Sequence, residues 1–239
     1  MKILIIAEAG INHLGDMTWA KEMVIRAKEA GADIFKTQLF DVDSLFPNKE
    51  IWAQGRNWYE VVKKTQLTKE QTFQLAEWCR EVDIEFMASA FDLERLGWLE
   101  EIGVRRHKVA SKSVNDVELI EAIKKTGKEV IASVPYGKFG DTELHRFDKV
   151  SSLYCIPEYP TIDLGEMFRS EYMWKAFAGF SDHSVGIEAS IVAMARGARI
   201  IEKHFCLSKD MVGPDIICSI IPSELKELVS FARKIELLT

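Results

Sequence analysis

Short apolar runs alternate along the chain with longer segments in which apolar residues recur every three or four positions. The first run, Ile3–Ala7, precedes a segment with Met23 and Ala27 at helical spacing, which Gly31 closes. Continuous apolar runs are typical of parallel strands buried on both faces, and the spaced pattern is typical of amphipathic helices. The pattern therefore predicts a chain built from repeated strand–helix units.

The unit repeats about eight times, the number found in a closed (β/α)8 TIM barrel, and 239 residues is a usual length for that fold. The expected strands are 3–7, 34–38, 85–89, 106–111, 129–133, 150–155, 176–180 and 198–201. We predict a single barrel domain over residues 1–239. An open doubly wound sheet is the alternative, but no Gly-x-Gly-x-x-Gly follows the first strand.

Helix signals fall between these strands. Asp16 is a suitable N-cap for the first helix, and Thr68 with Gln71 forms a capping box for the next one. Further helices are expected at 93–102, 114–125, 141–147, 164–177, 185–197 and 222–238.

One long stretch, 40–67, interrupts this regularity. It contains Pro47 and Gly55, and a short helix is expected at 58–64. Irregular stretches of this length in compact domains are commonly active-site lids or binding loops. We therefore predict that this segment covers a ligand site.

The composition is that of an ordinary globular protein, with 47% hydrophobic and 28% charged residues. The net charge is −6, with both signs mixed and no basic stripe, which argues against nucleic acid or an anionic membrane surface as a partner. The four cysteines form no C-x-x-C pair, as expected in a reducing cytoplasm. No apolar stretch approaches transmembrane length. We expect a cytoplasmic protein.

Two histidines follow neighbouring apolar runs, His183 after Gly179-Phe180-Ser181-Asp182 and His204 after Ile201-Glu202-Lys203. Their separation suits one right-handed crossover between adjacent parallel strands. Strand alternation places Ser181 on the face of His183, and Glu202 on the face of His204. Two imidazoles with a carboxylate can hold a divalent metal ion. The alternative is that either histidine is a packed core residue.

Polar residues end most of the other predicted strands, and in a barrel these ends meet at one mouth. They are Glu8, Lys36, Gln38, Ser89, Lys108, Ser111, Ser133, Ser181 and Glu202. A buried lysine costs several kcal/mol to desolvate unless an anion pairs with it. Lys36 and Lys108 therefore favour a ligand with phosphate and carboxylate groups. The alternative is a structural ion network in which they pair with Glu8 and Glu202.

These residues lie within motifs that together resemble one family, the N-acetylneuraminate (sialic acid) synthases. The resemblance extends in order from about Ile3 to Ser219. The motifs are Ile6-Ala7-Glu8-Ala9-Gly10-Ile11-Asn12-His13, Phe35-Lys36-Thr37-Gln38, Glu158-Tyr159-Pro160-Thr161, Phe180-Ser181-Asp182-His183-Ser184, Ile201-Glu202-Lys203-His204-Phe205 and Gly213-Pro214-Asp215.

The resemblance implies condensation of phosphoenolpyruvate with an amino-sugar aldehyde of the N-acetylmannosamine type, giving a nine-carbon 2-keto acid and phosphate. It implies a divalent metal, Mn2+ or alternatively Mg2+, held by His183 and His204. It implies that phosphoenolpyruvate is surrounded by Lys36, Ser89, Lys108, Ser111, Ser133 and Ser181. It implies that the sugar or the attacking water is faced by Glu8, Gln38, Tyr159 and Asp215. Catalytic roles fall to Glu8, Lys36, Lys108 and Glu202.

The sequence departs from the family near the expected sugar site. Ser113 stands where members commonly have a glutamate, and Lys112 where they usually have glycine. Members usually continue into a small antifreeze-like domain that supplies an arginine to a dimer partner's sugar site, and this chain is expected to lack it. We therefore expect weak sugar binding by this chain alone, with a homodimer or a separate sugar-binding domain as partner.

Two other functions fit the same residues. A metal-dependent barrel hydrolase would use the histidines, but such enzymes generally carry a histidine pair on the first strand, where this chain has only His13. A non-catalytic or partner-dependent paralogue would bind ligand without turnover. The presence of Glu8, both lysines and both histidines favours catalysis.

Overall fold

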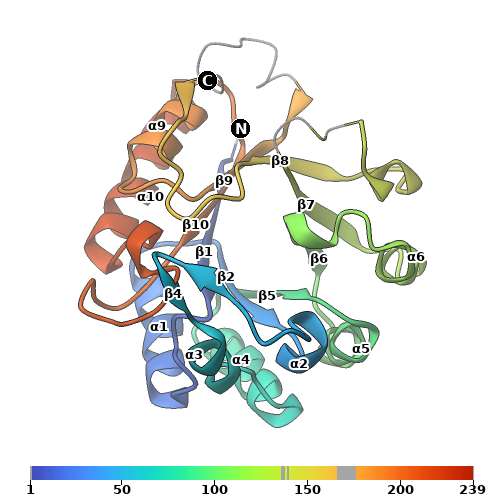
Figure 1. Ribbon diagram of the computed structural model, residues 1–239. Coiled ribbons are helices and arrows are strands. Elements are labelled where there is room, and N and C mark those ends of the chain that lie inside the picture. Colours follow the sequence, from blue (N-terminus) through green and yellow to red (C-terminus); the bar gives the residue numbers. More distant parts are fainter. Residues whose placement is uncertain (1, 136–137, 139, 166–175, 239) are drawn as a thin grey trace.

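Within the residues that the computed structural model describes (2–135, 138, 140–165 and 176–238), eight parallel strands close into a barrel. Figure 1 looks along the barrel, with the helices forming an outer ring. The order around the barrel is β1-β10-β9-β8-β7-β6-β5-β2, and β2 pairs with β1 to close it. The predicted (β/α)8 barrel is therefore confirmed.

The strands and helices alternate as the apolar pattern predicts. The barrel strands are β1 (Leu4–Gly10), β2 (Ile34–Leu39), β5 (Glu85–Ala90), β6 (Arg106–Val109), β7 (Glu129–Pro135), β8 (Ser151–Cys155), β9 (Gly179–Asp182) and β10 (Ile200–His204). The main outer helices are α1 (Met17–Glu29), α4 (Lys69–Glu81), α5 (Leu93–Ile102), α6 (Val117–Lys125), α9 (Glu188–Ala195) and α10 (Pro222–Glu236). Asp16 caps α1, and the capping box of Thr68 and Gln71 opens α4.

Two predicted elements differ from the structure, and a third is not tested by it. The fourth strand is expected to reach Ser111, but β6 ends at Val109, and Ser111–Ser113 form a 3-10 turn. The helix predicted at 141–147 is only a 3-10 turn, Glu143–Arg146. The helix predicted at 164–177 lies almost wholly outside the described residues.

The side chains that point into the barrel change from apolar to polar at one level. A buried apolar layer fills the lower interior, formed by Ile6, Ile34, Met87, Ile131, Leu153 and Ile200. Residues two positions apart on a strand face the same side. The next inward positions are therefore Glu8, Lys36, Ser89, Ser133, Cys155 and Glu202. The apolar layer is thus the floor of a polar chamber at the C-terminal end of the strands.

Residues 40–67 carry more structure than the sequence predicts. They form α2 (Val42–Leu45), a hairpin of β3 (Trp52–Ala53) and β4 (Arg56–Asn57), and α3 (Tyr59–Lys64). A separate small core holds them together, with Phe40 and Trp58 packed among its members. In Figure 1 this segment lies in front of the barrel, over the C-terminal ends of the strands.

No helix in the described part of the chain is both long and apolar enough to cross a lipid bilayer.

His13 lies in the turn after β1 and is almost fully buried. Its Nδ1 accepts a hydrogen bond from the Gly15 amide at 3.1 Å, while its Nε2 has no hydrogen-bond partner among the described residues. Burial lowers the pKa of His13 to about 4. The unfolded chain therefore takes up a proton near pH 6.5 that the folded chain does not accept until about pH 4.

We predict that His13 makes the protein acid-sensitive. The contribution of His13 to the free energy of unfolding is complete above pH 6.5. As the pH falls from 6.5 toward 4, protonation of His13 in the unfolded chain should lower this free energy by about 1.4 kcal/mol per pH unit. His13→Asn, whose amide oxygen can still accept from Gly15, should show a shallower decline. Urea unfolding of both proteins across this range measures the two slopes, and equal slopes would contradict the prediction.

Candidate active site

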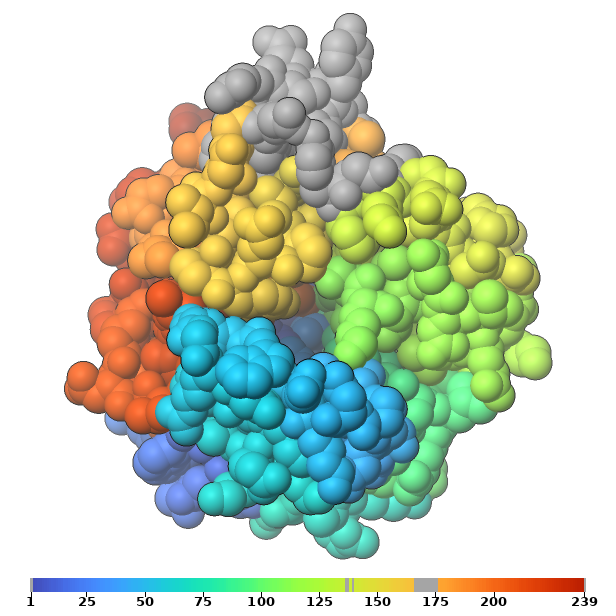
Figure 2. Space-filling view, viewed as in Figure 1, coloured from blue at the N-terminus to red at the C-terminus, as the bar shows by residue number. Residues whose placement is uncertain are grey.

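The polar inward-facing side chains line a small cavity of about 40 Å3 at the C-terminal end of the barrel. The lining residues are Glu8, Lys36, Gln38, Ser89, Lys108, Ala110, Ser111, Ser133, Cys155, Tyr159, Ser181, His183, Glu202 and His204. Figure 2 shows a hollow at the centre of this face, between the light-blue part of the 40–67 segment and the yellow residues after β8. All the predicted site residues except Asp215 lie in this lining.

Two lysines and two glutamates form an ion network in the chamber. The Lys36 ammonium lies 2.7 Å from Glu8 Oε2 and 3.8 Å from Glu202 Oε2, and the Lys108 ammonium lies 3.7 Å from Glu202 Oε1. All four side chains are at most 8% exposed. The ion network considered as the alternative is therefore present.

Polar neighbours complete the network. Lys108 donates to Ser133 Oγ at 2.7 Å and to its neighbour's carbonyl. Ser181 Oγ donates to Glu202 Oε1 at 3.1 Å, and Gln38 Nε2 donates to Glu8 Oε1 at 3.1 Å. Glu202 Oε2 and Ser89 Oγ have no hydrogen-bond partner within the described residues. These oxygens remain open to a ligand.

The two lysines are in different electrostatic states. Burial opposes the charge of Lys36, but Glu202 and Glu8 outweigh it and raise the pKa of Lys36 above its ordinary value. Burial lowers the pKa of Lys108, the charge of Glu202 does not compensate, and the nearby Lys36 lowers it further. Burial also opposes ionisation of Glu202, but Lys108 and Lys36 outweigh it and leave its pKa lowered. Lys108 is therefore the cation that an added anion would stabilise most.

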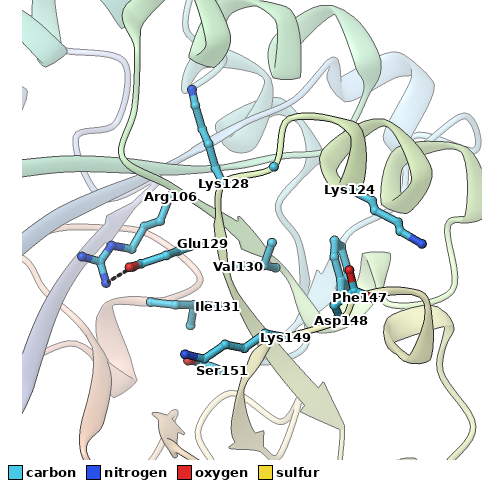
Figure 3. Close-up of a pocket in the computed structure, with 11 residues that line it drawn as sticks. Arg106, Lys124, Lys128, Glu129, Val130, Ile131, Phe147, Asp148, Lys149 and Ser151 are labelled. Carbon is cyan, nitrogen blue, oxygen red and sulfur yellow. Dashed lines mark ion pairs between the residues drawn. The ribbon is translucent and has the colours of Figure 1, made fainter.

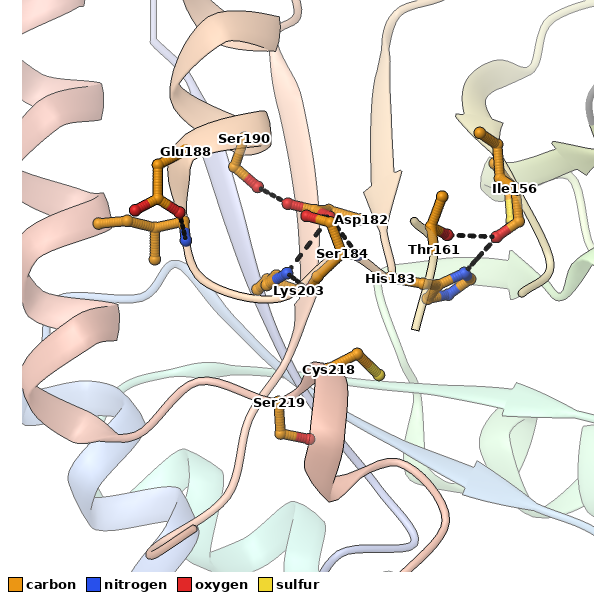
Figure 4. Close-up of polar contacts among 12 residues, drawn as sticks. Ile156, Thr161, Asp182, His183, Ser184, Glu188, Ser190, Lys203, Cys218 and Ser219 are labelled. Carbon is orange, nitrogen blue, oxygen red and sulfur yellow. Dashed lines mark hydrogen bonds and ion pairs between the residues drawn. The ribbon is translucent and has the colours of Figure 1, made fainter. Parts of the chain in front are cut away.

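His183 and His204 lie side by side at the rim, with ring centres 5.5 Å apart. His183 Nδ1 lies 2.7 Å from the Ile156 carbonyl oxygen, as Figure 4 shows. Because a carbonyl only accepts, Nδ1 carries the proton and Nε2 keeps its lone pair. His204 Nδ1 is buried and has no hydrogen-bond partner in the described part of the chain. Burial is the main cause that lowers the pKa of both rings, so both stay neutral.

The two imidazoles suit a shared divalent ion. Rings bound to one ion at metal–nitrogen distances of about 2.1 Å have centres roughly 5–6 Å apart, as here. The orphaned nitrogen of His204 and the lone pair of His183 are the donor type that first-row divalent metals accept. Within the described residues, no group of three or more His, Cys, Asp or Glu side chains is placed to hold a metal. The remaining ligands would therefore have to come from substrate or water.

Tyr159 and Asp215 flank the histidines. The Tyr159 ring stacks on His183 with centres 4.2 Å apart and meets His204 edge-on at 5.7 Å. Asp215 does not line the cavity, but its Oδ2 lies 3.9 Å from Nδ1 of His204, which does. Burial, followed by the charge of Glu8, raises the pKa of Asp215 to about 7.

Cys155 lines the chamber but was not among the predicted site residues. Its thiol lies 4.0 Å from His183 Nδ1, and burial raises its pKa to about 12. The signal for its position was available, because Cys155 follows Leu153 by two residues on β8 and so faces the same side. The Lys112 ammonium lies 4.0 Å from the centre of the Phe46 ring, in the segment 40–67.

A second cavity, of about 400 Å3, lies at the opposite end of the barrel (Figure 3). It is lined at the start of β6 and β7 by Arg106 and Glu129, which pair with each other at 3.2 Å. Arg106 also pairs with Glu85 at 2.8 Å. Chemistry in barrel enzymes is found at the C-terminal ends of the strands, so the chamber with the histidines is the candidate active site.

The closed barrel and its polar C-terminal mouth are the architecture of the (β/α)8-barrel enzymes. The chain belongs to the NeuB family, whose model matches residues 23–239. The resemblance to the sialic acid synthases is thereby confirmed.

Individual relatives match nearly the whole chain. An uncharacterized protein of Methanocaldococcus jannaschii is 35% identical over 97% of this chain and 70% of its own length. The N,N'-diacetyllegionaminic acid synthase of Campylobacter jejuni is 32% identical over 98% of this chain and 77% of its own. The N-acetylneuraminic acid (sialic acid) synthetase of Leptospira borgpetersenii, crystallised with citrate, has a TM-score of 0.90 at 32% identity, over 100% of this chain and 85% of that one. The named relatives differ in their sugar acid.

We predict that Lys36 and Glu8 depend on each other. Lys36→Met leaves two buried carboxylates without their shared cation and should cost about 3–5 kcal/mol of stability. Adding Glu8→Gln, which removes one of the stranded charges, should restore part of that loss. Chemical unfolding of the two single variants, the double variant and the wild type tests this coupling, and additive effects would contradict it.

Proposed function

We propose that this protein condenses phosphoenolpyruvate with an amino-sugar aldehyde of the N-acetylmannosamine type. The products would be a sialic-acid-type nine-carbon 2-keto acid and phosphate. A divalent ion, Mn2+ or Mg2+, would be held by His183 and His204. The observation that carries the proposal is the chamber itself, where two buried lysines, two buried glutamates and several serine hydroxyls meet a pair of neutral histidines.

The charges of the chamber support a pairing of phosphoenolpyruvate with a cation. Lys36, Lys108, Glu8 and Glu202 already balance one another. Phosphoenolpyruvate would add roughly 2.5 to 3 negative charges, from its phosphate and its carboxylate. Burying that charge requires compensation. A divalent ion between two neutral imidazoles supplies part of it, and Lys108, held as an ammonium by the new anion, supplies more.

The reaction forms one carbon–carbon bond and one carbon–oxygen bond to water, and it breaks the carbon–oxygen bond to the phosphate. C3 of the enol phosphate attacks the aldehyde carbon, and the aldehyde oxygen takes the negative charge. A bound divalent ion would act as a Lewis acid toward that oxygen. C2 becomes electron-poor, and water adds to it and gives up one proton while the aldehyde oxygen gains one. Phosphate then leaves with the C2–O bonding electrons, and the new C2 hydroxyl loses its proton, which produces the keto group.

The chain's own residues suit the remaining tasks. Lys36 and Lys108 can bind the anionic groups and offset charge on the departing phosphate, with the serine hydroxyls as further donors. The Glu8 carboxylate, paired with Lys36 through Oε2, can take the proton of the attacking water. Glu202, held between both lysines and Ser181, keeps their ammonium groups in place.

A hydrolase is less well supported. His13 would be the additional first-strand ligand, but it is buried in its turn and does not line the chamber. No third metal-binding side chain joins the two histidines in the part of the chain described. A ligand-binding paralogue without turnover is the alternative that the activity assay decides.

The test is phosphate release from phosphoenolpyruvate with Mn2+ and a panel of N-acetylated amino sugars. We predict sugar-dependent release by the wild type and its loss in His183→Ala and in His204→Ala, because each variant removes one of only two protein ligands. Circular dichroism confirms that the variants fold. Binding of phosphoenolpyruvate without release with any sugar would identify a non-catalytic relative, and release that survives both histidine substitutions would remove the metal role.

The segment 40–67 is proposed as the cover of the sugar site. Its hairpin tip reaches one side of the mouth, where Gln54 Nε2 donates to the Pro214 carbonyl at 2.9 Å. Its other end meets Lys112, whose ammonium lies over the Phe46 ring. The segment thus spans the mouth from the loop after β6 to the loop before Asp215. A covered site excludes water and strengthens polar contacts.

We predict that hydrogen exchange over 40–67 slows when phosphoenolpyruvate, metal and the productive sugar analogue are all present. Helix α5 on the outer ring is the internal control, and its exchange should not change. Gln54→Ala, which releases the hairpin tip, should raise the KM for the sugar more than that for phosphoenolpyruvate. Full turnover with unchanged exchange in this segment would show that it is no lid.

A further inference from the structure

A buried ion pair lies on the outer side of the barrel wall, behind the histidines. Asp182 and Lys203 have fully buried side chains, with Lys203 Nζ 3.2 Å from Asp182 Oδ1. The two residues are register partners on β9 and β10. Each directly precedes a histidine, so strand alternation turns the pair outward where the preceding Ser181 and Glu202 turn inward. On the outer side, Ser190 of α9 donates to Asp182 Oδ2 at 2.6 Å.

The pair holds the backbone immediately after His183 (Figure 4). Asp182 Oδ1 accepts from the Ser184 amide at 2.8 Å and from Ser184 Oγ at 2.6 Å. Lys203 Nζ donates to the Ser184 carbonyl at 2.6 Å. Ser184, directly after His183, is therefore bound to Lys203, directly before His204. Three hydrogen bonds and one ion pair thus connect the backbones of the two histidines.

Other contacts fix His183 from the opposite side. The Thr161 amide donates to the His183 carbonyl at 2.9 Å, and the Ile156 carbonyl holds the ring through Nδ1. At the base of the same strand pair, a Cβ on Gly179 would lie 1.9 Å from the Ile200 carbonyl oxygen, so β9 and β10 approach closely there. Gly179 keeps β9 and β10 close together at their N-terminal ends, and the Asp182–Lys203 ion pair connects them at their C-terminal ends.

Stability alone does not account for this arrangement. Replacing a buried ion pair by well-packed apolar residues is often neutral or even stabilising, because the charges must be desolvated. An apolar pair could not bind the amide and carbonyl of Ser184. What the charged pair adds is a fixed path for the chain between the two histidines.

We propose that Asp182 and Lys203 are positioning residues that set the spacing of His183 and His204, and thereby the affinity of the site for its divalent ion. This inference rests on the proposed metal role of the two histidines. Neither residue touches the chamber or its ligands. They act through the backbone, as partners behind metal ligands commonly do.

The test compares Mn2+ binding in the variants Lys203→Met, Asp182→Asn and the double variant. Lys203→Met alone strands a buried carboxylate, whereas the double variant leaves no unpaired charge and is the one designed to fold. Calorimetry, together with the electron paramagnetic resonance signal of free Mn2+, gives the dissociation constant of folded protein. We expect the double variant to bind Mn2+ about 10- to 100-fold more weakly than the wild type.

Arg106→Met is the control, because it removes the ion pairs of a buried arginine at the opposite end of the barrel, one of which Figure 3 shows. It should lower stability and leave Mn2+ affinity unchanged. Ser190→Ala, which removes one hydrogen bond to Asp182, is a milder variant that should weaken Mn2+ binding less than the double variant. If the double variant does not fold, the Mn2+ affinity of Ser190→Ala tests the proposal instead.

Each contrary outcome has a distinct meaning. Wild-type Mn2+ affinity in the folded double variant or in Ser190→Ala, with binding lost in His204→Ala, would overturn the positioning role and leave the metal site intact. Equal weakening by Arg106→Met would show a general effect of lost stability and would also overturn it. Absence of Mn2+ binding by the wild type would overturn the proposed metal role and this inference together.

Discussion

The structure depends on how four buried charges are compensated. Lys36 and Lys108 lie inside the barrel, where an unpaired ammonium would be expensive to desolvate, and Glu8 and Glu202 are their available counter-ions. The apolar layer beneath them excludes water from below, which strengthens every interaction above it. The chamber is therefore neutral as a whole and polar in every part. Such a site suits an anionic ligand that binds together with a cation.

The chamber results from the alternation of side chains along the strands of the barrel. Six of the eight strands contribute an apolar inward residue followed by one that lines the chamber, so the floor and the reactive layer come from the same strands. Outward positions of β9 and β10 are used as well, because Asp182 and Lys203 tie the backbones of the histidines together from behind. The inner face carries the proposed chemistry, and the outer face fixes its geometry.

The segment 40–67 adds a structured unit at the mouth without altering the barrel. Its own small core makes it a structured unit, and its contacts through Gln54 and Lys112 hold it across the mouth. Lys112 contacts the Phe46 ring and so links the loop after β6 to this segment. Ser113 is buried, and nothing in the structure assigns it a contact with a sugar.

The sequence by itself determined the strand–helix alternation, the barrel and most of the residues at its mouth, because burial on both faces and strand alternation are local properties readable from apolar runs. It predicted Glu8, Lys36, Lys108 and both histidines at one mouth, and the structure places them there. Only the tertiary structure decided which lysine is fully paired, that Cys155 joins the chamber, and that His183 is oriented by the Ile156 carbonyl. It also showed that the stretch 40–67 folds as a small unit, and that Ser111 belongs to a turn. These features depend on distances between segments far apart in the chain, and desolvation and ion pairing follow those distances, not the order of residues.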